Sequence, residues 1–214
     1  MSSKNKGTTK GDNVAVVIRC RPQNKREIKR GEEIIVTTNS VASEVVVQHP
    51  QRNQRDDGKR RFTFDHVFGP KSTQDDVYLT VVKPVVAEVL QGFNCTVFAY
   101  GQTGTGKTHT MEGDVSSQEQ KGIIPRSVED IFERLNALGS CDWSVKISFM
   151  ELYNEQLDDL LVQETTGPRL KLAQTASGDV VVQNLEDVLV KSADGIEFPE
   201  RGYLNGSFRL RHHL

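Results

Sequence analysis

The sequence predicts a protein of the α/β fold class, and three observations carry this prediction. Short runs of β-branched residues, typical of buried strands, alternate with longer segments whose apolar residues recur at helical spacing. The chain has 214 residues, which is enough for one sizeable α/β domain and argues against two full ones. Residues 101–108 read Gly-Gln-Thr-Gly-Thr-Gly-Lys-Thr, a complete G-x-x-x-x-G-K-T loop.

The composition is that of an ordinary globular protein, with 36% hydrophobic and 26% charged residues. The formal net charge of −2 gives no overall bias toward nucleic acid or membrane surfaces, so neither is expected as a partner. No signal peptide or membrane-spanning run is visible. Cys20, Cys95 and Cys141 are odd in number and far apart, which indicates reduced cytosolic thiols rather than disulfides or a zinc site.

The glycine-rich loop is the strongest functional signal in the chain. Glycines let the backbone curl so that successive N–H groups face phosphate oxygens, and the following helix turns its positive end to the same anion. Lys107 is expected to reach the β and γ phosphates, and the hydroxyl of Thr108 to ligate Mg²⁺. The predicted phosphate-binding residues are Gly101, Gln102, Thr103, Gly104, Thr105, Gly106, Lys107 and Thr108.

The N-terminal third is predicted to contain a tail and several short strands. Residues 1–12 are polar and are expected to be a disordered tail. A buried strand is predicted over 14–18, and Pro22 cannot continue it. Further short strands are predicted around 34–37, 45–48 and 62–64, with a turn at Asp57 and Gly58.

The middle of the chain is predicted to hold two helices and the strand that leads into the loop. The first helix runs over 74–90, begins after Ser72 or Thr73, bends at Pro84 and stops at Gly92. The apolar run 96–100 predicts a buried strand. The second helix starts in the loop, is interrupted by a polar surface loop over 112–122, and resumes near Pro125.

The last third is predicted to form strands with one short helix. Alternating apolar residues predict a strand over 145–152, and a short amphipathic helix is expected over 154–161. Residues 180–182 are predicted to pair with 188–190 as a hairpin. From about residue 195 the apolar residues follow neither helical spacing nor strand alternation, and no structure is assigned there.

Five segments resemble motifs of the kinesin motor domain and occur in the same order as in that family. The loop lies within 98–113, whose sequence closely resembles the nucleotide loop of that family. The other four segments are Arg19-Cys20-Arg21-Pro22, Phe64-Asp65-His66-Val67-Phe68, Gly122-Ile123-Ile124-Pro125-Arg126 and Glu151-Leu152-Tyr153-Asn154-Glu155. This resemblance implies a P-loop NTPase of kinesin motor type, with a mixed, mainly parallel sheet flanked by helices.

The resemblance also implies roles for residues on the adenine side of a bound ATP. It places Arg19, Arg21 and Pro22 along the adenine, Phe93 stacked near the base and His109 in contact with it. Phe93 departs from the tyrosine often found there, but stacking needs only a ring face. The alternatives are that the two arginines are solvated charges at the end of a strand, and that Phe93 is a core aromatic at a helix end.

By resemblance the partner is the microtubule, the location is the cytoplasm and cytoskeleton, and the subfamily is that of the bipolar mitotic kinesins of the spindle. Oligomers are expected only through a stalk, which these residues do not include.

The family's two switch motifs, N-x-x-S-S-R-S-H and D-L-A-G-S-E, are absent from the sequence, so no catalytic residue is assigned. We therefore expect residues 13–194 to be the first part of a motor domain, incomplete at its C-terminal side. Residues 195–214 are expected to be an atypical, non-native tail.

Two other functions stay open at this point. The chain could be a non-motile nucleotide-binding fragment or interaction protein without ATPase activity, or it could belong to another phosphate-loop class such as a helicase. The ordered motifs and the lack of a wide basic surface argue against a helicase. A local basic cluster could touch tubulin or act as a localisation signal, although a solvated hairpin tip is favoured. Its members are Arg52, Arg55, Lys59, Arg60 and Arg61.

Overall fold

A computed structural model of the chain describes residues 14–48, 58–139, 143–162, 168–193, 196 and 211–212. The chain forms two compact units, residues 1–73 and residues 74–214. The predicted tail 1–12, the turn residue Asp57 and most of the segment after residue 195 lie outside the described residues.

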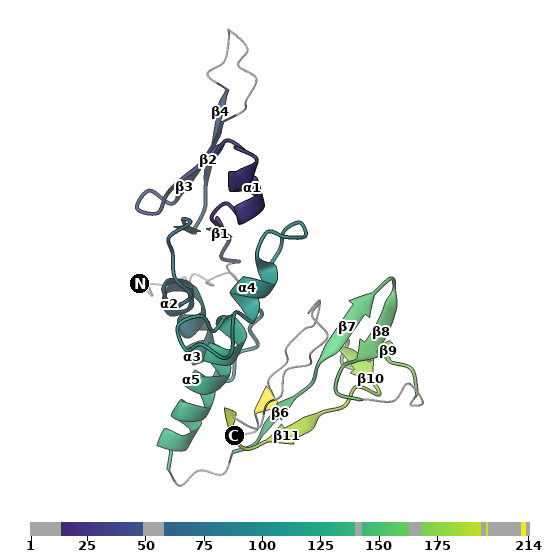
Figure 1. The fold of residues 1–214 in the computed structure, drawn as a ribbon. Helices are drawn as coiled ribbons and strands as arrows, with labels where there is room; N and C mark the ends of the chain where they lie inside the picture. The colour runs from purple at the N-terminus through teal and green to yellow at the C-terminus, as the bar shows by residue number, and fades with distance from the viewer. Residues whose placement is uncertain are drawn as a thin grey trace, which may run out of the picture. The chain divides into compact units, whose positions relative to one another are not determined.

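The first unit is built from two small sheets (Figure 1). Strand β1 (Val17–Arg19) pairs in parallel with β5 (His66–Phe68). The strands β2 (Val36–Asn39), β3 (Glu44–Gln48) and β4 (Lys59–Thr63) pair antiparallel in that order. The strand predicted over 14–18 starts three residues late, because the ladder to β5 begins only at Val17.

A short helix, α1 (Lys25–Lys29), follows β1 and was not predicted. The side-chain oxygen of Asn24 accepts from the N–H groups of Arg26 and Glu27, each at 2.9 Å. The Glu27 carboxylate in turn accepts from the Asn24 N–H at 2.8 Å, which completes a capping box. Five residues are too few to show a helical period, so only the cap could have signalled this helix.

The helix predicted over 74–90 is present in the second unit as three consecutive segments. These are α2 (Gln74–Val77), a π-helical turn η1 (Tyr78–Val82) and α3 (Lys83–Val89). The π turn ends at Val82, two residues before Pro84, which has no N–H to donate and whose ring would collide with a regular preceding turn. Gly92, with a φ of +95°, lies just beyond its end, as predicted.

Two helices follow the glycine-rich loop, and they confirm the predicted interruption. Helix α4 (Lys107–Met111) is short, and α5 (Ile123–Ala137) is the longest helix described. The apolar face of α5 packs against η1 and α3 to form the core of this unit. The buried members of that face are Ile123, Ile124, Pro125, Val128, Ile131, Phe132 and Leu135.

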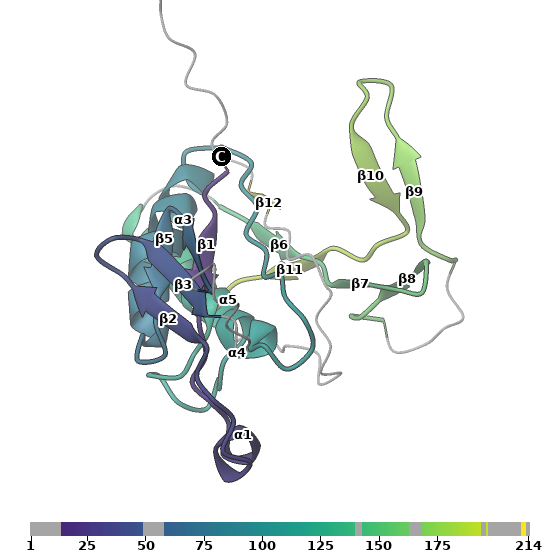
Figure 2. The same cartoon turned by 90° about the horizontal axis from the view of Figure 1, so that it is seen from above.

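The remaining strands of the second unit pair antiparallel (Figures 1 and 2). Strand β6 (Val145–Ile147) lies between β11 (Val188–Val190) and β12 (Arg211–His212). Two hairpins are formed by β7 (Met150–Tyr153) with β8 (Gln156–Asp159), and by β9 (Lys171–Gln174) with β10 (Val180–Gln183).

Two secondary-structure predictions are wrong in this region. The helix expected over 154–161 is instead the turn and second strand of the β7–β8 hairpin. Asn154 and Glu155 both have positive φ, +48° and +64°, which gives the two-residue turn that matches strand twist. The hairpin expected between 180–182 and 188–190 does not form, because β10 pairs with β9 and β11 pairs with β6.

The buried strand predicted over 96–100 is also wrong. These residues form no ladder with any described strand, and Phe98 and Tyr100 are 74% and 96% exposed. An apolar run becomes a strand only where neighbours supply ladder partners, so composition alone does not decide it. The expectation of a mainly parallel sheet is likewise not confirmed, since β1–β5 is the single parallel pairing among the described strands.

Candidate nucleotide-binding site

The loop of residues 101–108 has a strongly curled backbone. Gly101, Gly104 and Gly106 all have positive φ, at +156°, +80° and +102°. A Cβ atom on Gly101 would lie 2.7 Å from Oγ1 of Thr105, so a side chain there would collide with the loop itself. Gly106 is the residue before α4, and its left-handed backbone turns the chain into that helix.

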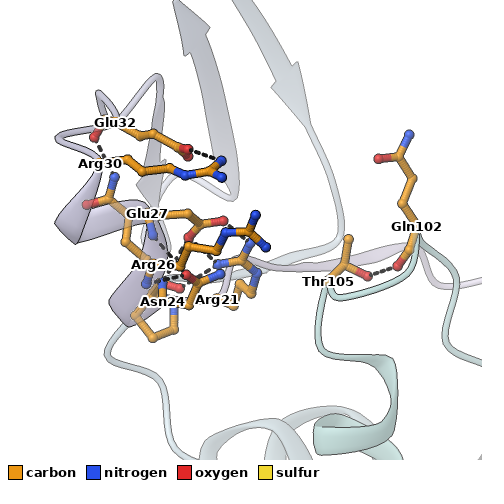
Figure 3. A network of polar contacts seen from close by, with 10 residues as sticks. Arg21, Asn24, Arg26, Glu27, Arg30, Glu32, Gln102 and Thr105 are labelled. Atoms are coloured by element: carbon orange, nitrogen blue, oxygen red, sulfur yellow. Dashed lines mark hydrogen bonds and ion pairs between the residues drawn. The ribbon is translucent and has the colours of Figure 1, made fainter.

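Donors from within the loop cover its first two carbonyl groups. The Thr105 hydroxyl donates to the Gln102 carbonyl at 2.7 Å (Figure 3), and the Thr105 N–H reaches the same oxygen at 3.3 Å. The Lys107 ammonium donates to the carbonyls of Gly101 and Gln102, at 2.9 and 3.1 Å. These bonds neutralise oxygens that would otherwise repel a phosphate. An ammonium has three N–H donors, so a third can face an anion.

Helix α4 carries Lys107 and Thr108 as its first two residues. The Thr110 N–H donates to the Gly106 carbonyl at 2.9 Å, and the Glu112 N–H donates to the Thr108 carbonyl at 2.8 Å. The side chains of Thr108 and His109 are exposed. A threonine hydroxyl is an oxygen ligand of the kind Mg²⁺ takes alongside waters and phosphate oxygens, so the residues present fit that ion. Among the described residues no His, Cys, Asp or Glu cluster could hold a metal ion.

The surface loop 113–121 closes on itself directly after α4. Gly113 and Lys121 form an isolated bridge, the Asp114 N–H donates to the Gln120 carbonyl at 2.9 Å, and the Gly122 N–H donates to the Glu112 carbonyl at 2.8 Å. A Cβ atom on Gly113 would lie 2.0 Å from the Gln120 oxygen. Only glycine therefore allows the two ends of this loop to approach so closely.

Two polar side chains outside residues 101–108 hold the segment that follows this loop, and the sequence analysis assigned neither of them a role. Gln74, only 3% exposed, donates from Nε2 to the His109 carbonyl at 2.6 Å and to the Gln120 carbonyl at 3.1 Å. Arg126 donates to the carbonyls of Lys121, Gln118 and Glu119 at 2.8, 2.9 and 3.1 Å, and forms an ion pair with Asp75. A glutamine on the buried side of an amphipathic helix was the available signal for Gln74.

Glu112 is the other polar group that sequence reasoning did not single out. It follows the last residue of α4, and its Oε1 is a buried atom for which the described part of the chain provides no hydrogen-bond partner. Burial raises the pKa of this carboxyl group above its ordinary value.

The predicted adenine-side residues Arg19, Arg21 and Pro22 belong to the first unit. Arg19 ends β1 and donates to the Ser72 carbonyl at 3.4 Å. Arg21 forms a two-pronged ion pair with Glu27, with N···O distances of 2.7 and 2.5 Å (Figure 3). Hydrogen bonds from Arg21 and from the Asn24 backbone lower the pKa of Glu27 to about 2. The adenine roles of these residues stay predictions.

Phe93 lies in the second unit, just beyond the end of α3. Its N–H donates to the Glu88 carbonyl at 3.2 Å, and its side chain is 61% exposed. The alternative of a core aromatic is therefore wrong, while the predicted stacking role stays a prediction. His109, the other predicted base contact, is the third residue of α4, so the structure joins it directly to the loop.

The basic cluster falls partly on a described strand. Lys59, Arg60 and Arg61 lie on β4, where every side chain is exposed, and Arg61 pairs with Glu44 at 3.0 Å. Arg52 and Arg55 lie outside the described residues. An exposed strand with an ion pair to its neighbour agrees with the solvated hairpin that the sequence favoured.

The curled loop, its lysine and the following helix have the sequence and backbone features that are typical of a P-loop. The model of the kinesin motor domain family matches residues 19–201. Kinesin-like protein KIF11-A of Xenopus laevis is 43% identical over 219 residues, which cover 94% of this chain and 20% of that protein. Kinesin-like protein KIN-5A of Arabidopsis thaliana is 44% identical over 199 residues, 87% of this chain and 19% of that protein.

The chain belongs to the kinesin motor domain family. Kinesin-like protein KIN-5C of Nicotiana tabacum is 41% identical over 213 residues, which cover 92% of this chain and 20% of that protein. The KIF11 and KIN-5 relatives support the resemblance to the bipolar mitotic kinesins. The chain spans about a fifth of the length of these curated relatives.

No helix within the described ranges combines the length and the apolar character that crossing a membrane requires.

Proposed function

We propose that this chain binds Mg-ATP through residues 101–108. The observation that carries the proposal is the conformation of the loop itself. Three glycines with positive φ curl the backbone, and Lys107 and Thr105 cover the first two carbonyl oxygens. The loop can therefore offer N–H groups and an ammonium to an anion without opposing carbonyl dipoles.

The wider function we propose is that of a microtubule motor, in which ATP hydrolysis is coupled to movement along the filament. Family membership supports this function and, with it, a P-loop NTPase fold. The cofactors are ATP and Mg²⁺, with Thr108 as the magnesium ligand. The proposed adenine-side contacts are Arg19, Arg21, Pro22, Phe93 and His109.

The proposed partner is the microtubule, which places the protein on the cytoskeleton and, for the bipolar mitotic subfamily, on the spindle. Membranes and nucleic acids are not proposed as partners, and any oligomer would form through a stalk.

A second candidate is a nucleotide-binding chain that does not move. Its basis is that the residues assigned here hold phosphates, whereas phosphoryl transfer also needs a positioned water and stabilised charge. Microtubule-stimulated phosphate release separates the two candidates: a motor accelerates phosphate release when microtubules are added, and a non-motile chain does not.

Replacing Lys107 tests the site. In equilibrium titrations with a fluorescent ATP analogue and Mg²⁺, Lys107→Ala is expected to abolish binding, because no other side chain of the loop carries a positive charge. Lys83→Ala, which removes an exposed lysine from α3, is the control and should bind like the unaltered chain. Undiminished binding by Lys107→Ala would contradict the site assignment.

A further inference from the structure

Gln74 is one of two polar residues that the described part of the chain buries, and Ser148 is the other, each 3% exposed. Burying an amide is unfavourable unless its hydrogen-bonding capacity is used. Gln74 opens α2, far along the chain from the glycine-rich loop, yet its hydrogen bonds reach the segment directly after that loop.

The Gln74 amide acts as a double donor. Its Nε2 atom lies 2.6 Å from the His109 carbonyl oxygen and 3.1 Å from the Gln120 carbonyl oxygen. Both partners can only accept, and an amide nitrogen carries two N–H groups, so one nitrogen satisfies both bonds. No apolar side chain of similar size can replace this arrangement.

The first of these bonds caps the end of α4. This helix has five residues, too few to be stable without support from its surroundings. Carbonyl groups in the last turn of a helix have no partner within it. The Thr108 carbonyl accepts from the N–H groups of Glu112 and Gly113, at 2.8 and 3.2 Å, and Gln74 supplies the donor for His109.

The second bond ties that helix end to the base of the loop 113–121. The Gln120 carbonyl also accepts from the Asp114 N–H at 2.9 Å, within the bonds that close the loop. Arg126 holds the same loop through the carbonyls of Gln118, Glu119 and Lys121. Gln74 therefore links α4 to a loop that is itself anchored to α5.

We propose that Gln74 is a positioning residue for nucleotide binding, which acts by fixing α4 and with it Lys107 and Thr108. The inference rests on the proposed Mg-ATP site. Without the amide, the carbonyls of His109 and Gln120 each lose a donor and the short helix loses its cap. Lys107 and Thr108 then sample more orientations, and a ligand must restrict that motion when it binds.

The test compares Gln74→Met with Tyr78→Phe in the full 214-residue chain. Tyr78 lies four residues further along the same helical run and is 6% exposed, and its hydroxyl donates to Asp130 at 2.9 Å. Each variant thus removes one buried donor group, but only Gln74 contacts the segment after the loop. We expect Gln74→Met to raise the Kd for Mg-ATP about three- to tenfold and Tyr78→Phe to leave it unchanged.

The second readout is amide hydrogen exchange without nucleotide. Gln74→Met should speed exchange at Thr110, Glu112 and Gly113, whose N–H groups form the backbone bonds of α4, and leave α5 unaffected. An unchanged Kd would overturn the positioning role, whether or not exchange in α4 becomes faster. Equal increases of Kd in both variants would do the same, because they would show a general loss of stability.

Two further measurements keep the result interpretable. Gln74→Asn, which keeps the donor on a chain one methylene shorter, replaces Gln74→Met if the latter does not fold, with the same expected direction. The unaltered chain and Lys107→Ala are titrated alongside. If the unaltered chain does not bind Mg-ATP, the proposed function and this inference both fail. If it binds and the Gln74 variants bind equally well, only the positioning role fails.

Discussion

At the scale of single residues, the hydroxyl of Thr108 is the group on which the proposed magnesium contact depends. It is exposed at the start of α4, where only its chemistry, and no fold-wide effect, should change on substitution. We expect Thr108→Ala to lose most of the difference in ATP affinity between magnesium-containing and chelator-treated solutions. Thr108→Ser keeps the hydroxyl and should keep that difference. An alanine variant with the full magnesium effect would contradict the assignment.

Tyr78 is a residue with a structural role that can be measured independently of the site. Its hydroxyl donates to Asp130, which also accepts two bonds from Arg134 at 2.8 and 3.1 Å. We expect Tyr78→Phe to lower the free energy of unfolding by about 1–2 kcal/mol, measured by denaturant titration. Burial and the bond to Asp130 raise the pKa of the Tyr78 phenol, so this contribution is complete below the ordinary tyrosine pKa and is lost progressively as the pH rises above it. An unchanged midpoint would contradict it.

Single residues also show where sequence reasoning stops. The eight loop residues were predicted because their motif is local and contiguous. Gln74 was not, because its partners His109 and Gln120 lie 35 and 46 residues away, and no local pattern encodes such contacts. Arg21 was predicted as an adenine contact, whereas its partner Glu27 could only be identified from the fold of the segment between them.

At the scale of elements, α1 is held by its cap and by the Arg21–Glu27 ion pair. The pKa of Glu27 is lowered from 4.5 to about 2, so its contribution to stability is complete above about pH 4.5 and is lost as the pH falls through about 2. We expect the Glu27 carboxyl, followed by NMR, to titrate near pH 2 in the unaltered chain. In Arg21→Met the same titration should move up toward the ordinary value. A midpoint near 4.5 in the unaltered chain would contradict the pairing.

Helices were predicted well where apolar residues recur at helical spacing over many residues. The run from Gln74 to Val89 and the helix α5 both show an apolar face at helical spacing, and both are present. The short elements were harder. Helix α1 has too few residues for a period, and the β7–β8 hairpin turns at Asn154 and Glu155 without the glycine that usually marks such a turn.

At the scale of the whole molecule, the class of protein was predictable and the strand pairing was not. Five ordered motifs led to the kinesin motor domain, which the family match over residues 19–201 confirms. Pairing depends on which strands meet, and β6, β9, β10 and β11 pair in a way that no local alternation specifies. The run 96–100 shows the same limit, since its composition indicates a strand but the described strands do not pair with it.

Hydrogen exchange measured with and without Mg-ATP is the experiment that tests whether residues 101–108 cradle the phosphates of ATP. We expect nucleotide to slow exchange in peptides that cover the loop and α4, and to leave the β7–β8 and β9–β10 hairpins unchanged. Lys107→Ala should remove the effect. Protection that leaves out the loop and α4, or that survives in Lys107→Ala, would contradict the proposed site.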